Sequence, residues 1–404
     1  MVLPLKNKDL PKGYRLFGCR CGQSARPGKK DVALFLSDRP AVAAGVFTTN
    51  IVHAAPVAWC RQTLKKSPKA RAVFINSGCA NACTGSQGME DTAWTALTLA
   101  QKLRLNPEDI LIASTGVIGK HLNRLALEKG IKMLSHQAQT NETPSVDNAV
   151  HAIMTTDTRP KTARAVFKAG GKSFTIWGCA KGAGMIHPNM ATMLSVVLTD
   201  AEIPAKPLQK ILAETASKTF NRVSVDGDTS TNDSLFLLAN GAQGRVDSAD
   251  EKGMDAFALS LHQVCLSLAT QIAKDGEGAT RTAWIHVVGA KNETEAQACA
   301  STVATSALFK TALHGADPNW GRILAALGRA GVPFDPNRVD VSIGNVIVCH
   351  RGERAHFSEK KVHALLKKPT VTVSVDLHQG QATGSYVTCD YSKDYIAINA
   401  DYTT

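Results

Sequence analysis

A glycine-rich segment in the middle of the chain constrains the fold more than any other stretch. Residues 181–194 read KGAGMIHPNMATML, so a turn leads into an apolar run, 193–198, that we expect to be a strand. Ala191 and Thr192 lie at this junction. A threonine whose preceding peptide bond is cut becomes an N-terminal nucleophile, with its own amine as base. The segment alone is equally compatible with an ordinary turn in which Thr192 is only a strand former.

Length and composition indicate a globular protein. The chain has 404 residues, enough for two or three domains, and 44% of them are hydrophobic. No apolar run approaches the ~20 residues of a membrane span, and the N-terminus shows no secretory or transit signal. The ten cysteines follow neither a disulfide framework nor zinc-site spacing. We therefore expect a cytoplasmic protein with reduced thiols, no metal and no membrane partner.

The basic charge does not indicate a nucleic-acid partner. The net charge is +12, but Lys and Arg are scattered, and aromatic residues make up only 5% of the chain. A nucleic-acid surface would cluster its cations and interleave aromatic rings for stacking. We interpret the charge as a solvated basic surface, which would also favour an anionic small substrate.

Hydrophobic periodicity alternates between helix and strand along the whole chain and predicts an α+β fold without internal repeats. Helices are expected at 91–105, with Asp91 as N-cap, at 122–135, around 146–154, at 205–220 and at 255–274. Strands are expected at 32–36, 43–47, 71–75, 110–113, 172–177, 193–198, 222–225, 284–289, 370–377 and 384–387. The last two strands alternate as in a closing antiparallel sheet.

Common catalytic motifs are missing or incomplete. Gly171-Lys172-Ser173 resembles the end of a phosphate loop, but Val166 stands where that loop needs glycine. No dinucleotide, zinc-protease or serine-hydrolase motif occurs. By contrast, Thr115-Gly116 follows a predicted strand, and a hydroxyl beside a glycine N–H suits an oxyanion hole. A plain strand-to-loop turn is the alternative.

Three further polar clusters stand out. Thr155 and Thr156 form a hydroxyl cluster after a predicted helix. The alternative is that they are a simple polar cap of that helix. Residues 226–233 are rich in side-chain acceptors, but they lack the glutamate of a calcium loop, so we expect a rigid turn. Glu277 lies between two glycines at a predicted helix end, where backbone can approach a ligand.

Together these blocks resemble the ornithine acetyltransferase (glutamate N-acetyltransferase) family of bifunctional arginine-biosynthesis enzymes. The match covers essentially the whole chain, and its specificity comes from the blocks occurring together and in order. The blocks are 76–85, 113–116, 154–157, 181–194, 225–233, 274–281, 317–322 and 398–404.

The resemblance implies a self-cleaving precursor. Cleavage between Ala191 and Thr192 would give an α chain, 1–191, and a β chain, 192–404, with a smaller C-terminal α/β region from about residue 280. The implied fold is a mixed-sheet sandwich flanked by helices, of the N-terminal-nucleophile type. An assembly of two α and two β chains is also implied.

The resemblance also implies the site. Thr192 is the nucleophile, and Thr115 and Gly116 form the oxyanion hole. The implied substrate-binding residues are Thr155, Lys181, Thr192, Glu277, Asn399 and Thr404. Because Thr156 is adjacent to Thr155, the resemblance leaves open which of these two threonines contacts the substrate.

The implied reaction moves acetyl from N2-acetyl-L-ornithine to L-glutamate through acetyl-Thr192, without a cofactor. Whether acetyl-CoA also serves as a donor substrate stays open. The alternative is a self-processing aminopeptidase or amidohydrolase, which would use water as acceptor and would not need the blocks at 154–157 and 399–402.

Overall fold

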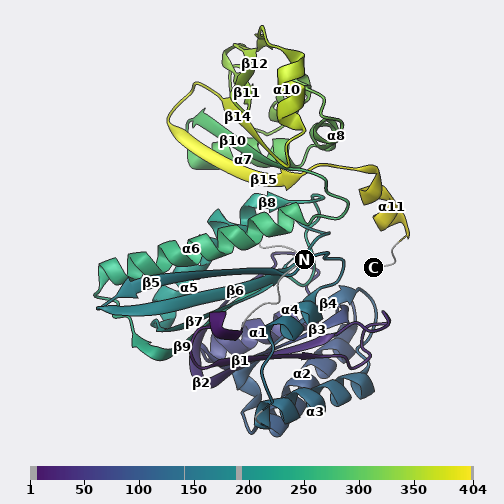
Figure 1. Cartoon of the computed structure of the whole chain (residues 1–404), viewed down its shortest axis with the longest axis vertical. Coiled ribbons are helices and arrows are strands. Elements are labelled where there is room, and N and C mark those ends of the chain that lie inside the picture. The colour runs from purple at the N-terminus through teal and green to yellow at the C-terminus, as the bar shows by residue number, and fades with distance from the viewer. Residues whose placement is uncertain (1–6, 141, 188–192, 402–404) are drawn as a thin grey trace.

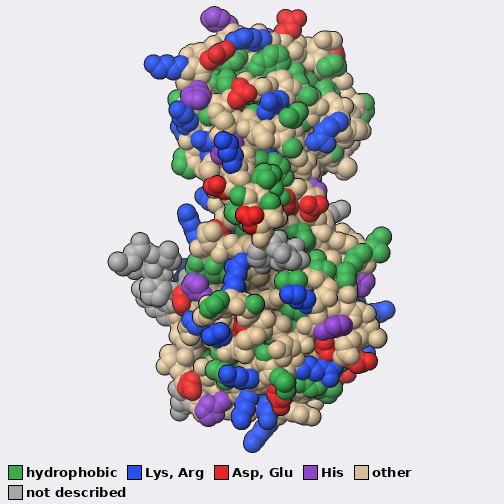
Figure 2. Space-filling view, turned by 90° about the vertical axis from the view of Figure 1, so that its right-hand side faces the viewer, with side chains coloured by type: hydrophobic (Ala, Val, Ile, Leu, Met, Phe, Trp, Pro, Cys, Tyr) green, Lys and Arg blue, Asp and Glu red, His purple; other side chains and the backbone are tan. Residues whose placement is uncertain are grey.

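The structure is a computed structural model that describes residues 7–140, 142–187 and 193–401. Figure 1 shows two bodies stacked along the long axis, with the first half and the middle of the chain in the lower one. The upper body holds the elements from β10 (Thr282–Ala290) to β15 (Ala382–Cys389). Figure 2 shows a narrower waist between the bodies, where acidic side chains gather.

The lower body is built on a mixed sheet of order β4-β3-β2-β9-β7-β6-β5, with β1 paired to β2. The β3–β4 and β7–β9 pairs are parallel and the other pairs are antiparallel. β7 and β9, which follow Thr192 in the chain, lie between β2 and β6, which precede it. The strands are β1 (Tyr14–Cys19), β2 (Val32–Phe47), β3 (Lys69–Cys79), β4 (Ile110–Val117), β5 (Lys161–Ala169), β6 (Lys172–Lys181), β7 (Leu194–Glu202) and β9 (Ser234–Arg245).

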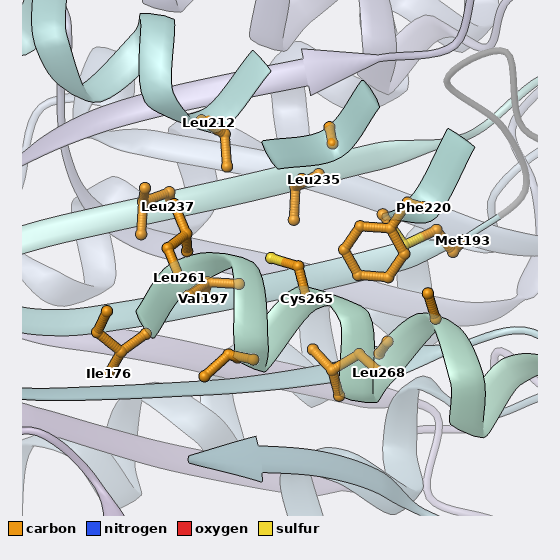
Figure 3. Close-up of a cluster of buried hydrophobic side chains, with 14 of the residues drawn as sticks. Ile176, Met193, Val197, Leu212, Phe220, Leu235, Leu237, Leu261, Cys265 and Leu268 are labelled. Atoms are coloured by element: carbon orange, nitrogen blue, oxygen red, sulfur yellow. The ribbon is translucent and has the colours of Figure 1, made fainter. Parts of the chain in front are cut away.

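Helices cover both faces of this sheet because alternate strand residues are apolar on each side. On one face, α5 and α6 pack against β5, β6, β7 and β9; Figure 3 shows Leu212 of α5 and Leu261 of α6 meeting Val197 and Leu237 of the strands. α2 and α3 cover the β3–β4 end, and α4 packs on the opposite face. The helices are α1 (Ala55–Lys66), α2 (Gly85–Leu103), α3 (Arg124–Gln139), α4 (Val146–Ile153), α5 (Ala205–Lys218) and α6 (Glu251–Lys274).

Among the described residues, α6 is the one helix long and apolar enough to cross a membrane by length and composition. Half of its apolar window is buried in the protein, where Phe257, Val264 and Leu268 contribute to the core beside the sheet. Its composition is therefore accounted for by its place in the core.

The upper body contains a second mixed sheet of order β13-β12-β11-β14-β10-β15-β8. Its edge strand β8 (Val223–Ser224) comes from the chain of the lower body and so joins the two bodies. Helices cover the face that bears Ile285 and Val373. The remaining strands are β11 (Asp340–Ile343), β12 (Val346–His350), β13 (Glu353–Arg354) and β14 (Thr370–Asp376), and the helices are α7 (Glu293–Ala304), α8 (Ala307–Gly315), α9 (Trp320–Leu327) and α10 (Glu359–Leu366).

The last helix, α11 (Lys393–Asp401), lies apart from the upper sheet and none of its residues is buried (Figure 1). Its N-terminal end is held by Ser392, whose hydroxyl donates to Gly278 O at 2.6 Å. This contact keeps α11 beside the segment that follows α6.

The predicted α+β class, with mixed sheets flanked by helices, is confirmed. Four local expectations are wrong. Asp91 is not an N-cap, because α2 begins at Gly85 and Asp91 pairs with Arg124 at 2.7 Å. The two strands at 32–36 and 43–47 are one strand, β2, because a register shift between Leu36 and Ala41 accommodates the exposed turn-like residues.

The other two errors concern pairing and length. β14 and β15 do not pair with each other, because β10 lies between them, parallel to β14 and antiparallel to β15. β4 does not end at Ala113; it continues to Val117, so Thr115 and Gly116 belong to the strand. The missed β9 is apolar on both faces, as expected for a strand at the centre of a covered sheet.

Candidate active site

A polar cavity of about 160 Å³ lies where β4 and β6 end, beside the segment after α6. Its lining comes from both sides of the segment 188–192 in the chain. The lining residues are Ala80, Thr115, Gly116, Ile118, Thr155, Thr156, Lys181, Gly184, Met185, Asp226, Asp228, Ser230, Thr231, Asn232, Glu277, Tyr395 and Asn399.

The cavity brings together most of the residues that the sequence singled out. They come from β4, the turn after α4, the end of β6, the turn after α6, and α11. Ala191, Thr192 and Thr404 lie outside the described residues. The predicted site residues that line the cavity are Thr115, Gly116, Thr155, Lys181, Glu277 and Asn399.

Gly116 adopts a conformation that other residues rarely take. Its φ is +133°, and a Cβ added there would lie 2.4 Å from the backbone carbon of Gly78 on β3. The parallel pairing of β3 with β4 therefore requires glycine at this position. The neighbouring Thr115 points a nearly buried hydroxyl at the cavity.

Lys181 organises the hydroxyl groups of the cavity. Its Nζ donates to Thr155 Oγ1 at 2.6 Å and to Thr115 Oγ1 at 3.1 Å. An ammonium has three N–H donors, so the group can still donate to a ligand. Burial lowers the pKa of Lys181, while the nearby Asp157 carboxylate acts in the opposite direction. An anion bound in the cavity would therefore favour the charged lysine.

A buried ion network next to Lys181 holds the end of β6, where this lysine lies. Lys161 Nζ contacts Asp157 at 2.7 Å and Asp275 at 2.5 Å, and these three side chains are at most 5% exposed. Asp157 also accepts from the backbone N–H groups of Gly182, at 2.6 Å, and Thr155, at 2.9 Å. Burial raises the pKa of Asp157, but the charges of Lys181 and Lys161 outweigh it, and the pKa lies well below its usual value.

Glu277 places its carboxylate at the cavity because its backbone is fixed by Ala183 and its side chain has room beside Gly184. The Glu277 backbone N–H donates to Ala183 O at 2.9 Å, which fixes the turn after α6. A Cβ at Gly184 would lie 2.4 Å from the carboxylate, so glycine is needed there. Asn399 Nδ2 of α11 donates to Glu277 Oε2 at 2.9 Å. The predicted carboxylate at a helix end is thus present and connected to α11.

Sequence reasoning underestimated the segment 226–233. It was expected to be a rigid turn, and Asp226, Asp228 and three following residues in fact line the cavity. Asp226 accepts from the backbone N–H groups of Met185 and Ile186, the latter at 2.8 Å. Burial raises the pKa of Asp226 to about 6. The density of acceptors in the sequence was the available signal, but acceptors that hold a turn and acceptors that line a cavity look alike in sequence.

The same segment holds the described residues on both sides of 188–192. Ile186 forms a bridge with Thr229, and Thr229 Oγ1 donates to His187 O at 2.9 Å. After the gap, Ser234 N donates to Met193 O at 3.0 Å. The flank before 188–192 therefore lies against Thr229, next to the cavity-lining residues 230–232, and the flank after it lies against Ser234, the first residue of β9.

The chemistry available to the cavity is that of hydroxyls, an ammonium and carboxylates. No group of three or more His, Cys, Asp or Glu side chains that could hold a metal occurs within the described ranges. Cys79 and Cys83, which are four residues apart in the sequence, are free thiols.

Fold and cavity together define an α+β enzyme whose site is assembled from both halves of its chain. The model of the ArgJ family matches residues 15–404. The arginine biosynthesis bifunctional protein ArgJ of Synechocystis is 46% identical, over 98% of this chain and 98% of its own.

Two solved structures are similar as well. The arginine biosynthesis bifunctional protein of Bacillus halodurans is 42% identical, with a TM-score of 0.50 over 52% of this chain and 100% of its own. The ornithine acetyltransferase of Mycobacterium tuberculosis, in complex with ornithine, is 38% identical, with a TM-score of 0.39 over 45% of this chain and 94% of its own.

The chain belongs to the ArgJ family. The predicted resemblance to the acetyltransferase family of arginine biosynthesis is thereby confirmed, and the aminopeptidase alternative is not supported.

Proposed function

We propose that the cavity transfers acetyl from N2-acetyl-L-ornithine to L-glutamate through an ester on Thr192, after the chain cuts itself between Ala191 and Thr192. One observation carries the proposal. Residues as far apart in the chain as Thr115 and Asn399, chosen from sequence alone, line a single cavity, and the segment that contributes 230–232 to it also holds both flanks of 188–192.

In the first half-reaction, the Thr192 hydroxyl attacks the acetyl carbonyl carbon and its proton passes to the Thr192 amine. The pKa of such an amine, ~7.7–8.0, lies close to neutral pH. The Thr115 hydroxyl and the Gly116 N–H stabilise the oxyanion. The C–N bond then breaks, and the amine proton leaves with ornithine.

In the second half-reaction, the amine of glutamate attacks the acetyl ester and the same groups act in reverse order. Lys181 holds the α-carboxylate that both substrates share, and Glu277 accepts from a substrate ammonium group. Thr155, Asn399 and Thr404 complete the contacts to substrate. No cofactor takes part, because the ester itself carries the acetyl group; acetyl-CoA would enter only as another donor substrate at Thr192.

The length of the Bacillus halodurans chain supports the cut. That chain is matched over its full length by about half of this one, whereas the Synechocystis relative is matched over nearly its whole length. Residues 192–404 are also about half of the chain. We extend the proposal to an α chain, 1–191, and a β chain, 192–404, with a smaller C-terminal region from about 280, assembled as two of each in the cytoplasm.

Product analysis tests the reaction. The purified protein is incubated with N-acetylornithine and glutamate, and the products are separated. Acetylglutamate with free ornithine is the expected outcome. Free acetate, formed at the same rate with and without glutamate, would show hydrolysis and contradict the proposal.

A further inference from the structure

The proposed reaction sets a problem of charge, and the inference below rests on that reaction. The donor side chain ends in an ammonium, whereas the acceptor side chain ends in a carboxylate. Both must place their α-groups at Thr192 in turn. A distal subsite with a single fixed charge would bind one of them and repel the other.

A second cavity adjoins the first across Thr156 and Glu277, which line both. It has a volume of about 340 Å³ and carries charges of both signs. Arg26 contributes a guanidinium, and Glu277 and Asp401 contribute carboxylates. The other lining residues are Thr156, Thr158, Gly278 and Ile398.

Arg26 is held in place by its contact with the site. Its Nη1 donates to Thr155 O at 2.6 Å, and Lys29 of the same loop donates to Met154 O. Thr155 is the residue whose hydroxyl contacts Lys181. A guanidinium has five N–H donors in a planar fork, so it can bind a carboxylate while keeping one bond to a carbonyl.

The loop that carries Arg26 is itself rigidly anchored. The buried carboxylate of Asp31 accepts from the backbone N–H groups of Cys21, at 2.7 Å, Gly22, at 3.0 Å, and Ser24, at 2.9 Å. Preorganised cations bind anions better because little conformational entropy is lost on binding.

Positive charge is concentrated on this side of the site. The pKa of Lys29 is lowered to about 8, first by burial and then by the charges of Lys181 and Arg26. Three cations that repel one another form a region that an anionic group would stabilise.

We propose that the second cavity is a distal-charge subsite in which Arg26 binds the side-chain carboxylate of the acceptor, while Asp401 and Glu277 attract the side-chain ammonium of the donor. Opposite charges in one small cavity let a distal end of either sign find a partner. A neutral distal end finds none, so this subsite selects for charged side chains. Arg26 is thus a specificity residue for the second half-reaction.

Comparison of two acceptors tests the subsite. Glutamine has nearly the shape of glutamate but a neutral end, so the ratio of kcat/KM for glutamate to that for glutamine measures recognition of the distal charge. In Arg26→Gln we expect kcat/KM for glutamate to fall about 10- to 100-fold, as for the loss of a charged hydrogen bond. The ratio should approach one.

Arg20→Gln is the matched control, because it removes the same charge from an exposed position of the same loop. It should keep the wild-type ratio. Acetylation of the Arg26→Gln enzyme by N-acetylornithine, followed by intact mass, shows that the variant is folded and should change far less than its use of glutamate.

An unchanged glutamate-to-glutamine ratio in Arg26→Gln would overturn the subsite, whether kcat/KM stays the same for both acceptors or falls equally for both. Failure of the proposed reaction is distinguishable, since wild type would then form no acetylglutamate at all.

Discussion

At the scale of single residues, Lys181 determines how the hydroxyls of the cavity act. An ammonium can only donate, so the Oγ1 atoms of Thr115 and Thr155 both act as acceptors toward it. The hydroxyl proton of Thr115 is then directed elsewhere, and Thr115 lines the cavity. A hydroxyl polarised in this way is a good donor to an oxyanion.

Thr115→Ala should therefore lower kcat by about 10²–10³, because it removes one oxyanion donor. KM for N-acetylornithine should change much less, since the interaction forms only in the transition state. Thr115→Ser keeps the hydroxyl and should retain most of the activity. A wild-type kcat in fully processed Thr115→Ala would remove this residue from the reaction.

Asp226 should make stability depend on pH in an unusual direction. Burial raises its pKa to about 6, so the folded protein binds this proton more tightly than the unfolded chain does. The contribution to stability is complete below the unfolded pKa of ~3.9 and is lost as pH rises through about 6.

The measurement compares unfolding by urea in wild type and Asp226→Asn between about pH 4 and pH 7. The free energy of unfolding of wild type, relative to the variant, should fall by up to ~3 kcal/mol over this range. A difference that does not change with pH would show that Asp226 titrates as an ordinary carboxyl.

At the scale of elements, the sequence predicted the helices α2 to α6 and more than half of the strands, but not which strands are neighbours. The hydrophobic periodicity of α6 and β6 depends only on residues close together in the chain, so the sequence alone reveals these elements. That β10 lies between β14 and β15 depends on which edges meet in space, which periodicity does not encode. The expected strands at 32–36 and 43–47 are continuous, because β2 bulges between Leu36 and Ala41 and then goes on.

The residues that the family resemblance singled out lie closer together than periodicity could predict, because a resemblance depends on combinations of residues. Thr115, Lys181 and Glu277 were found in this way and line one cavity. Asp226 and Tyr395 were not, because the first has the composition of a turn and the second lies on a helix with no clear amphipathic pattern.

Lys161 connects three elements and should matter for stability. It pairs with Asp157, next to the Thr155 turn, and with Asp275, at the end of α6. Lys161→Met would remove the cation that the buried carboxylates of Asp157 and Asp275 share, and it should cost about 3–5 kcal/mol of unfolding free energy. Lys168→Met, on the exposed face of the same strand β5, should cost little.

Urea unfolding of both variants gives the comparison. If Lys161→Met and Lys168→Met were equally stable, the buried network would not hold these elements together. Adding Asp275→Asn to Lys161→Met removes one unpaired charge and should restore part of the stability.

At the scale of the whole molecule, the two predicted fragments are interleaved. β7 and β9, from the part after Thr192, lie between β2 and β6, from the part before it. The cavity likewise combines Thr115 and Lys181 with Glu277 and Asn399. A cut at Ala191/Thr192 would therefore leave one folded body, because separating the fragments would break the centre of the lower sheet.

Intact mass under denaturing conditions tests the central claim most directly. The purified protein should give two masses, for residues up to Ala191 and for residues from Thr192 to the end. With N-acetylornithine, the second fragment should gain the mass of one acetyl group, and added glutamate should remove it. Thr192→Ala should give one uncut chain that gains nothing. A single full-length mass from wild-type protein that still converts glutamate to acetylglutamate would contradict the account.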